Sequence, residues 1–266
     1  SYCWIWQKNN PAGTQFDYSE VPNTGKTYML DMSAYKNGSV KIAFYVETES
    51  SDFDVHVDNV RVMQIENMFT KNTENGCWNE QDNWSNGTIP GTSDNVVVAG
   101  AAIVPNDVVA SANTITLAST GSLTIADGGQ LVHNNAGVQA TVQKHIEKHG
   151  EDDGWYFISS SVATDVAPSL ENGIVAPTAE NYDLYYYDEP AHYWRNYKEG
   201  GLYSGFNIAP QKGYLYANGE ENGTILSFAG TLQPGNEDVE KTLEFNTEEG
   251  AVLAGWNLVG NPFTFN

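Results

Sequence analysis

Alternation of apolar and polar residues is the commonest pattern along this chain, and it predicts β-strands. Residues 40–46 and 53–60 alternate most clearly, so that Phe53, Val55 and Val57 would share one face of a strand. Successive strand side chains point to opposite faces of a sheet, which gives each strand one buried and one solvated side. Clusters of Gly, Pro, Asn and Asp bound these runs and predict tight turns, while helical periodicity is almost absent. We therefore expect an all-β fold.

A short repeat occupies the middle of the chain, where inward-facing pairs recur every eight residues with glycines between them. The pairs are Ile115 with Leu117, Leu123 with Ile125, and Leu131 with His133. Each unit predicts one short strand followed by a tight glycine turn. Such units bury their faces by stacking as a small β-solenoid or by running as a meander of hairpins. In either arrangement we expect a structural spacer.

Two similar segments bracket the last part of the chain. Residues 154–160 and 255–261 both begin with Gly-Trp and continue as a hydrophobic strand that ends in small polar residues. Further strand-like runs lie between them at 182–188, 212–216 and 226–232. Short strands separated by turn signals predict a β-sandwich-like module.

The distribution of basic residues divides the chain into three zones. Lys71 is followed by no Lys or Arg until Lys144, and the chain then becomes acidic and rich in Tyr. We expect domain boundaries close to these changes, which gives modules at 1–66, 67–146 and 147–266.

Charge limits the classes of partner. The 266 residues include 12 Lys and Arg against 34 Asp and Glu, a net charge of −22, and no two basic residues are adjacent. This excess repels phosphate backbones and anionic lipids, so we expect no nucleic-acid partner. No apolar run approaches the length of a membrane span.

The first zone resembles a known family. Residues 28–35, 40–44 and 56–62 are similar to the C-terminal half of a cleaved-adhesin (choice-of-anchor) jelly roll. The resemblance implies that residues 1–66 form a partial jelly-roll domain whose other strands lie upstream.

The later zones resemble the repetitive β modules of large bacterial surface proteins of the haemagglutinin type. The motifs are residues 76–78, 82–85, 89–90 and 94–98, followed in order by the two Gly-Trp stretches, with Ser161 where the family usually has Pro. The resemblance implies a secreted or cell-surface bacterial adhesin. It also implies further strands after the second stretch, so we expect residues 147–266 to be an incomplete module.

Acidic residues on the strand at 53–60 are candidate calcium ligands. Asp54 and Asp58 share a face with His56, and calcium prefers carboxylate and carbonyl oxygens. Calcium at Asp54 and Asp58 follows from similarity to calcium-bearing jelly rolls, and the alternative is a solvated acidic strand face.

The Tyr-rich stretch is the best candidate for ligand binding. The residues that we single out are Tyr185, Tyr187, Tyr193, Trp194 and Arg195. Sugar rings stack on aromatic side chains while Arg and carboxylates bond the hydroxyls. The alternative is cross-strand packing within the core.

Other motifs carry less chemistry. His145 and His149 have the spacing of the two His of a zinc-protease helix, but Glu147 stands two residues after the first His instead of directly after it. The segment continues an alternating run, and on a strand the two His would lie over ~13 Å apart, so we expect a strand running into a loop there. Cys3 and Cys77 are a possible disulfide pair whose geometry the sequence does not give. No nucleophile elbow or phosphate loop is present, so we expect no enzyme activity in this chain.

The sequence therefore predicts a non-catalytic fragment of a secreted or cell-surface bacterial adhesin or scaffold. Its expected partners are host or neighbouring-cell proteins or glycans, and the rest of the parent polypeptide. The alternative is an accessory binding region of a secreted protease or glycosidase whose catalytic domain lies elsewhere.

Overall fold

The computed structural model describes residues 66–71, 76–150, 154–200, 205–246 and 252–266. The chain divides into two compact units, Ser1–Val62 and Met63–Asn266. The first unit lies outside the described residues, and so do the predicted jelly roll and the candidates Cys3, Asp54 and Asp58.

The described part of the chain is all-β, as expected. Its helices are three-residue 3₁₀ turns, η2 (Gln81–Asn83), η3 (Ala179–Asn181) and η4 (Glu189–Ala191). The strands are β1 (Asn67–Phe69), β2 (Asn95–Val98), β3 (Ala101–Val104), β4 (Val109–Ser111), β5 (Thr114–Leu117), β6 (Ser122–Ile125), β7 (Gln130–Val132), β8 (Gln139–Ile146), β9 (Trp155–Ser159), β10 (Tyr182–Asp188), β11 (Tyr193–Asn196), β12 (Gly213–Asn218) and β13 (Thr224–Thr231).

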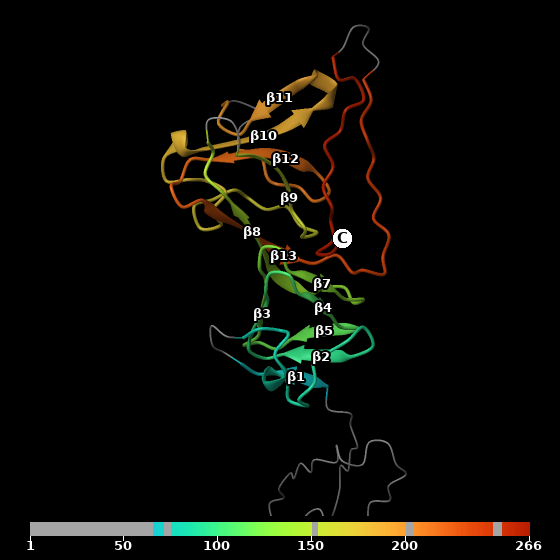
Figure 1. Ribbon diagram of the computed structural model, residues 1–266. Coiled ribbons are helices and arrows are strands. Elements are labelled where there is room, and N and C mark those ends of the chain that lie inside the picture. Colours follow the sequence, from blue (N-terminus) through green and yellow to red (C-terminus); the bar gives the residue numbers. More distant parts are fainter. Residues whose placement is uncertain (1–65, 72–75, 151–153, 201–204, 247–251) are drawn as a thin grey trace, which may run out of the picture. The chain divides into compact units, whose positions relative to one another are not determined.

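Strands β1 to β8 form a β-solenoid. β1, β2 and β5 pair in parallel, as do β3, β6 and β8, and β4 pairs in parallel with β7 (Figure 1). A meander of hairpins would pair consecutive strands antiparallel. Parallel pairing of non-consecutive strands therefore decides between the two arrangements that the sequence left open.

The eight-residue repeat corresponds to the sides of one coil. The consecutive strands β5, β6 and β7 each lie in a different sheet, so the eight-residue units do not stack on one another. Stacked residues come from successive coils, as when Ala102 lies opposite Leu123 and Ala110 lies opposite Leu131. Of the six predicted inward positions, Leu117 is half-buried and the other five are buried, His133 fully so.

The solenoid corners require glycine at close approaches. A Cβ atom at Gly121 would lie 1.9 Å from the carbonyl oxygen of Val98 in the preceding coil. Only a residue without a Cβ fits there, which explains the glycine at the corner between β5 and β6.

Aromatic residues fill the solenoid near its first strand. Phe69, Trp78 and Trp84 are each at most 3% exposed. The Trp84 ring makes edge contacts with Trp78 at 4.8 Å and with Phe69 at 5.2 Å between ring centres. Its indole N–H donates a 2.8 Å hydrogen bond to the Trp78 carbonyl. The tryptophans of the sequence motifs at 76–78 and 82–85 are thus core residues of this end.

Strand β8 joins the solenoid to the remaining strands. It pairs in parallel with β6 on one side and antiparallel with β13 along its whole length on the other. The boundary predicted at residue 146 therefore falls at the end of a strand that the second and third modules share.

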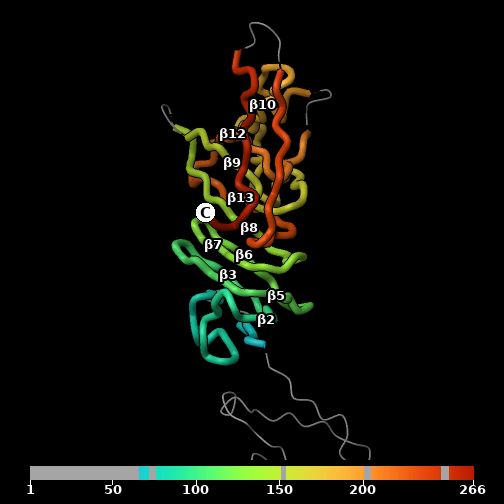
Figure 2. The backbone as a smooth tube through the Cα atoms, turned by 90° about the vertical axis from the view of Figure 1, so that its right-hand side faces the viewer, coloured from blue at the N-terminus to red at the C-terminus, as the bar shows by residue number. Residues whose placement is uncertain are grey.

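The remaining strands form a four-stranded antiparallel sheet in the order β11-β10-β12-β9 (Figures 1 and 2). One face carries the buried residues Leu184, Tyr214 and Tyr216. The Tyr214 hydroxyl donates to the Asn207 carbonyl and accepts from the Ala209 N–H, which fastens this face to the loop before β12. We call it the core face.

The chain then forms a C-terminal arm, defined here as residues 238–246 and 252–260, drawn in red tones in Figures 1 and 2. The two limbs lie side by side, because the Asn257 amide bonds both the N–H and the carbonyl of Glu244. Val259 forms an isolated bridge with Lys212, next to the start of β12.

Candidate binding face

The register of the β10–β11 hairpin separates the five predicted binding residues. Tyr187 lies opposite Trp194, whereas Tyr193 lies opposite Asp188 and Arg195 lies opposite Tyr186. Directly opposed residues share a face and neighbours along a strand do not. Tyr185, Tyr187 and Trp194 therefore lie on one face, while Tyr193 and Arg195 lie on the core face.

Arg195 contacts other side chains of the core face. Its Nε donates a 2.8 Å hydrogen bond to Asp188, and the two side chains are only 14% and 18% exposed. Its guanidinium carbon lies 5.0 Å from the ring centre of Tyr193. These contacts give Arg195 a packing role at the sheet corner.

The other face of the sheet presents aromatic side chains to solvent. Phe157, Leu215 and Tyr185 form one row across β9, β12 and β10. Trp155 lies beside this row, with its ring centre 6.0 Å from that of Tyr185. Phe157 is 72% exposed and Trp155 is 46% exposed. We name these four residues the open aromatic face.

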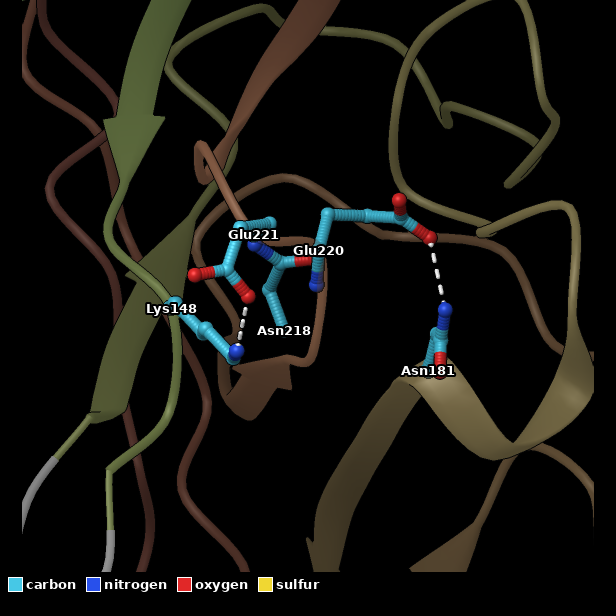
Figure 3. A network of polar contacts seen from close by, with 5 residues as sticks. All are labelled: Lys148, Asn181, Asn218, Glu220 and Glu221. Atoms are coloured by element: carbon cyan, nitrogen blue, oxygen red, sulfur yellow. Dashed lines mark hydrogen bonds and ion pairs between the residues drawn. The ribbon is translucent and has the colours of Figure 1, made fainter.

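A polar network holds the connection between β8 and β9, next to Trp155. Lys148 pairs with Glu221, and the Asn181 side chain donates to Glu220 at 3.0 Å (Figure 3). The His149 N–H donates to the carbonyl of buried Asn218 at 2.7 Å. The His149 ring then makes an edge contact with Trp155, at 5.5 Å between ring centres. The network therefore positions His149 against Trp155, beside the aromatic row.

The β11 side of the same face is closed. Tyr187 is 9% exposed and packs edge-on against Trp194, at 5.5 Å between ring centres. Among the described residues its hydroxyl has no hydrogen-bond partner. Burial, with the nearby negative charges of Glu189 and Asp188, raises the pKa of Tyr187, so its hydroxyl stays protonated.

Glu189 holds the C-terminal arm. It is 2% exposed, and one carboxylate oxygen accepts the N–H groups of Asn246 and Gly255, each at 2.7 Å. Burial acts to raise the pKa of Glu189, but these two donors and nearby His192 outweigh it, so the pKa lies below its usual value. An ionised Glu189 thus fixes both limbs of the arm.

The remaining sequence candidates do not converge on a site. His145 is the penultimate residue of β8 and His149 lies in the loop that follows, as expected of a strand running into a loop. Within the described residues no group of three His, Cys, Asp or Glu is placed to hold a metal. Cys77 is half-buried, and the pairing with Cys3 stays a prediction.

Trp155 and Phe157 are the members of the face that sequence reasoning missed. Residues 155–158 are all apolar or aromatic, so alternation does not indicate which side of the strand is solvated. The similar Gly-Trp stretch at 255 gives no sequence signal of exposure either, although the structure leaves Trp256 62% exposed.

Comparison with known proteins identifies no relative, since no protein family, curated protein or solved structure matches this chain. No helix in the described ranges has the length and apolar character needed to cross a membrane.

Proposed function

We propose that this chain is a non-catalytic binding region of a secreted or cell-surface bacterial adhesin, and that it holds a protein or glycan partner on the open aromatic face. The observation that carries the proposal is the contrast between the two faces of one sheet. The core face buries Leu184, Tyr214 and Tyr216, whereas the other leaves Trp155 and Phe157 largely in solvent.

An aromatic ring that stays exposed to water contributes little burial of apolar surface to the stability of the fold. Contiguous exposed apolar patches commonly mark interaction sites. Tyr and Trp are also enriched among residues that dominate interface energies. The resemblance of the chain to adhesin modules supports the same class of function.

The solenoid supports the proposal as a spacer. Its interior is filled with apolar side chains, which range from Ala102 and Val104 to Leu131 and Trp78.

An array that displays both glycans and extracellular-matrix proteins tests the proposal. We expect the wild-type chain to bind at least one class, and the double variant Trp155→Ala, Phe157→Ala to lose that binding. The matched control is Leu170→Ala, which removes a side chain that is 60% exposed on a turn away from the face. Array binding that survives in the double variant would refute the function.

A further inference from the structure

The first limb of the C-terminal arm, residues 238–246, is fixed at both ends. Just before it, the Gly235 N–H donates to the His133 carbonyl at 2.7 Å. At its far end, the Asn246 N–H donates to the Glu189 carboxylate at 2.7 Å. Between these points the limb runs as an extended trace (Figures 1 and 2). Its path is therefore set by its two anchors.

The first limb stands where an edge strand of the antiparallel sheet would stand. The second limb extends that sheet, because the Gly213 N–H at the start of β12 donates to the Leu258 carbonyl at 2.9 Å. The Asn257 amide in turn holds the backbone of Glu244, which places the first limb beside the second. The arm thus adds two chain segments to one side of β12.

The backbone groups on the outer side of the first limb are unpaired. Glu244 directs both its N–H and its carbonyl towards the second limb. In an extended chain the neighbouring residues direct theirs to the opposite side, so those of Lys241, Leu243 and Phe245 point outward. Among the described residues, none of these outward groups makes a hydrogen bond. An ordered, unpaired edge is a template to which another segment can add as a strand.

The side chains of the first limb present two different faces. Leu243 and Phe245 are 57% and 72% exposed, and alternation places both on one face. Asp238, Glu240 and Glu244 fall on the other face. Every residue from 240 to 245 is exposed, so no described segment covers either face. An added strand would meet apolar side chains on one face and carboxylates on the other.

Charge selects the partner of this edge. Residues 237–246 include four acidic residues against one Lys, and none of these five side chains has an ion-pair partner within the described ranges. A second copy would bring the same acidic strand and the same net charge of −22, so pairing of two copies is repelled. A cationic strand is attracted to the edge and complements its carboxylates.

We propose that the first limb is a docking edge for a basic, extended segment of a partner polypeptide, which adds to it as a β-strand. Its apolar side chains cover Leu243 and Phe245, and its cations lie beside Glu240 and Glu244. This inference goes beyond the proposed function, because none of these residues belongs to the open aromatic face. A second copy of the chain is the competing occupant.

Fluorescence anisotropy with a short labelled peptide, in which Lys and Val alternate, tests the role of charge. We expect the full chain to bind this peptide and not its counterpart with Glu in place of Lys. The double variant Asp238→Lys, Glu240→Lys should weaken binding about tenfold. The matched control is Asp165→Lys, Glu171→Lys, which changes the net charge equally at exposed positions outside the arm and should bind as wild type.

Two proline variants test strand addition. Lys241→Pro removes an outward N–H, whereas Thr242→Pro removes an N–H on the side of the second limb. Neither N–H is bonded within the described residues, so both variants should keep the wild-type melting temperature. We expect Lys241→Pro to weaken peptide binding about tenfold and Thr242→Pro to bind as wild type. Hydrogen–deuterium exchange of residues 238–246 should slow when the Lys–Val peptide is added.

Each other outcome overturns the proposal. Absence of binding by the Lys–Val peptide, or equal binding of the Glu–Val peptide, removes the basis in charge. Equal effects of the two proline variants, or binding without slower exchange at residues 238–246, excludes strand addition at this edge. A chain that sediments as a dimer and already has slow exchange there without peptide assigns the edge to a second copy.

Discussion

Truncation of Trp84 should destabilise the solenoid at its first coil. The change Trp84→Ala removes a ring that is 3% exposed and in edge contact with both Phe69 and Trp78. Truncation of a buried Trp to Ala costs about 3–5 kcal/mol, because it leaves a cavity as well as removing apolar burial. We expect a loss of stability near the upper end of this range, because the hydrogen bond from the Trp84 indole N–H to the Trp78 carbonyl is lost too.

The variant Trp84→Phe separates these contributions. It keeps an aromatic ring but loses the N–H donor to the buried Trp78 carbonyl, which costs about 1–3 kcal/mol. The control is Ile89→Ala, at a side chain in the same region that is 42% exposed, with an expected change of about 0.5 kcal/mol or less.

Urea unfolding followed by far-ultraviolet circular dichroism measures these free energies without relying on tryptophan fluorescence. The reasoning predicts the order Trp84→Ala, then Trp84→Phe, then Ile89→Ala, from largest to smallest loss. A loss below about 1 kcal/mol for Trp84→Ala would show that this aromatic cluster does not hold the coil together. Equal losses for the Ala and Phe variants would refute the role of ring packing.

Three further changes have definite expected outcomes. Glu189→Ala removes the acceptor that holds the arm, so trypsin should cleave several-fold faster at exposed Lys241, and an unchanged rate would count against the anchor. Burial lowers the pKa of His133 despite its bonds to Asn135, so stability from its neutral form is full above the ordinary pKa of 6.5 and falls as pH drops below it. His133→Leu should flatten this slope in urea unfolding between about pH 6.5 and 5, and an unaltered slope would contradict the assignment. The melting temperature should be higher with calcium than with a chelator, and the double variant Asp54→Asn, Asp58→Asn should lose this difference. The absence of a difference in the wild-type chain would exclude the calcium site.

The sequence predicts the strands better than their partners. The eight-residue pattern and its glycine turns located the three strands between 115 and 133, and Ile115, Leu123 and Leu131 are inward-facing as expected. The eight-residue period could not reveal that these residues lie on three sides of one coil. The alternation within a strand shows which side chains face inward, but it does not show which other strand pairs with it.

The binding residues show a similar limit. The Tyr-rich hairpin was found from composition, but the hairpin register sends Arg195 and Tyr193 to the core face. A shift of one residue would have reversed that assignment, and composition contains no information on register. Trp155 reaches Tyr185 only through the placement of β12 between their strands, a long-range pairing that no local motif encodes.

Strand β8 has a consequence for folding cooperativity. The last coil of a solenoid leaves a row of unpaired N–H and carbonyl groups, which invites other chains to add to it and aggregate. Here β13, more than seventy residues later in the chain, covers that row from Gln139 to Ile146. The solenoid is therefore protected only once the following module has folded, and that module in turn builds on the solenoid's edge. Residues 63–266 should melt in one transition, and the chain cannot be cut at residue 146 into two independently stable pieces.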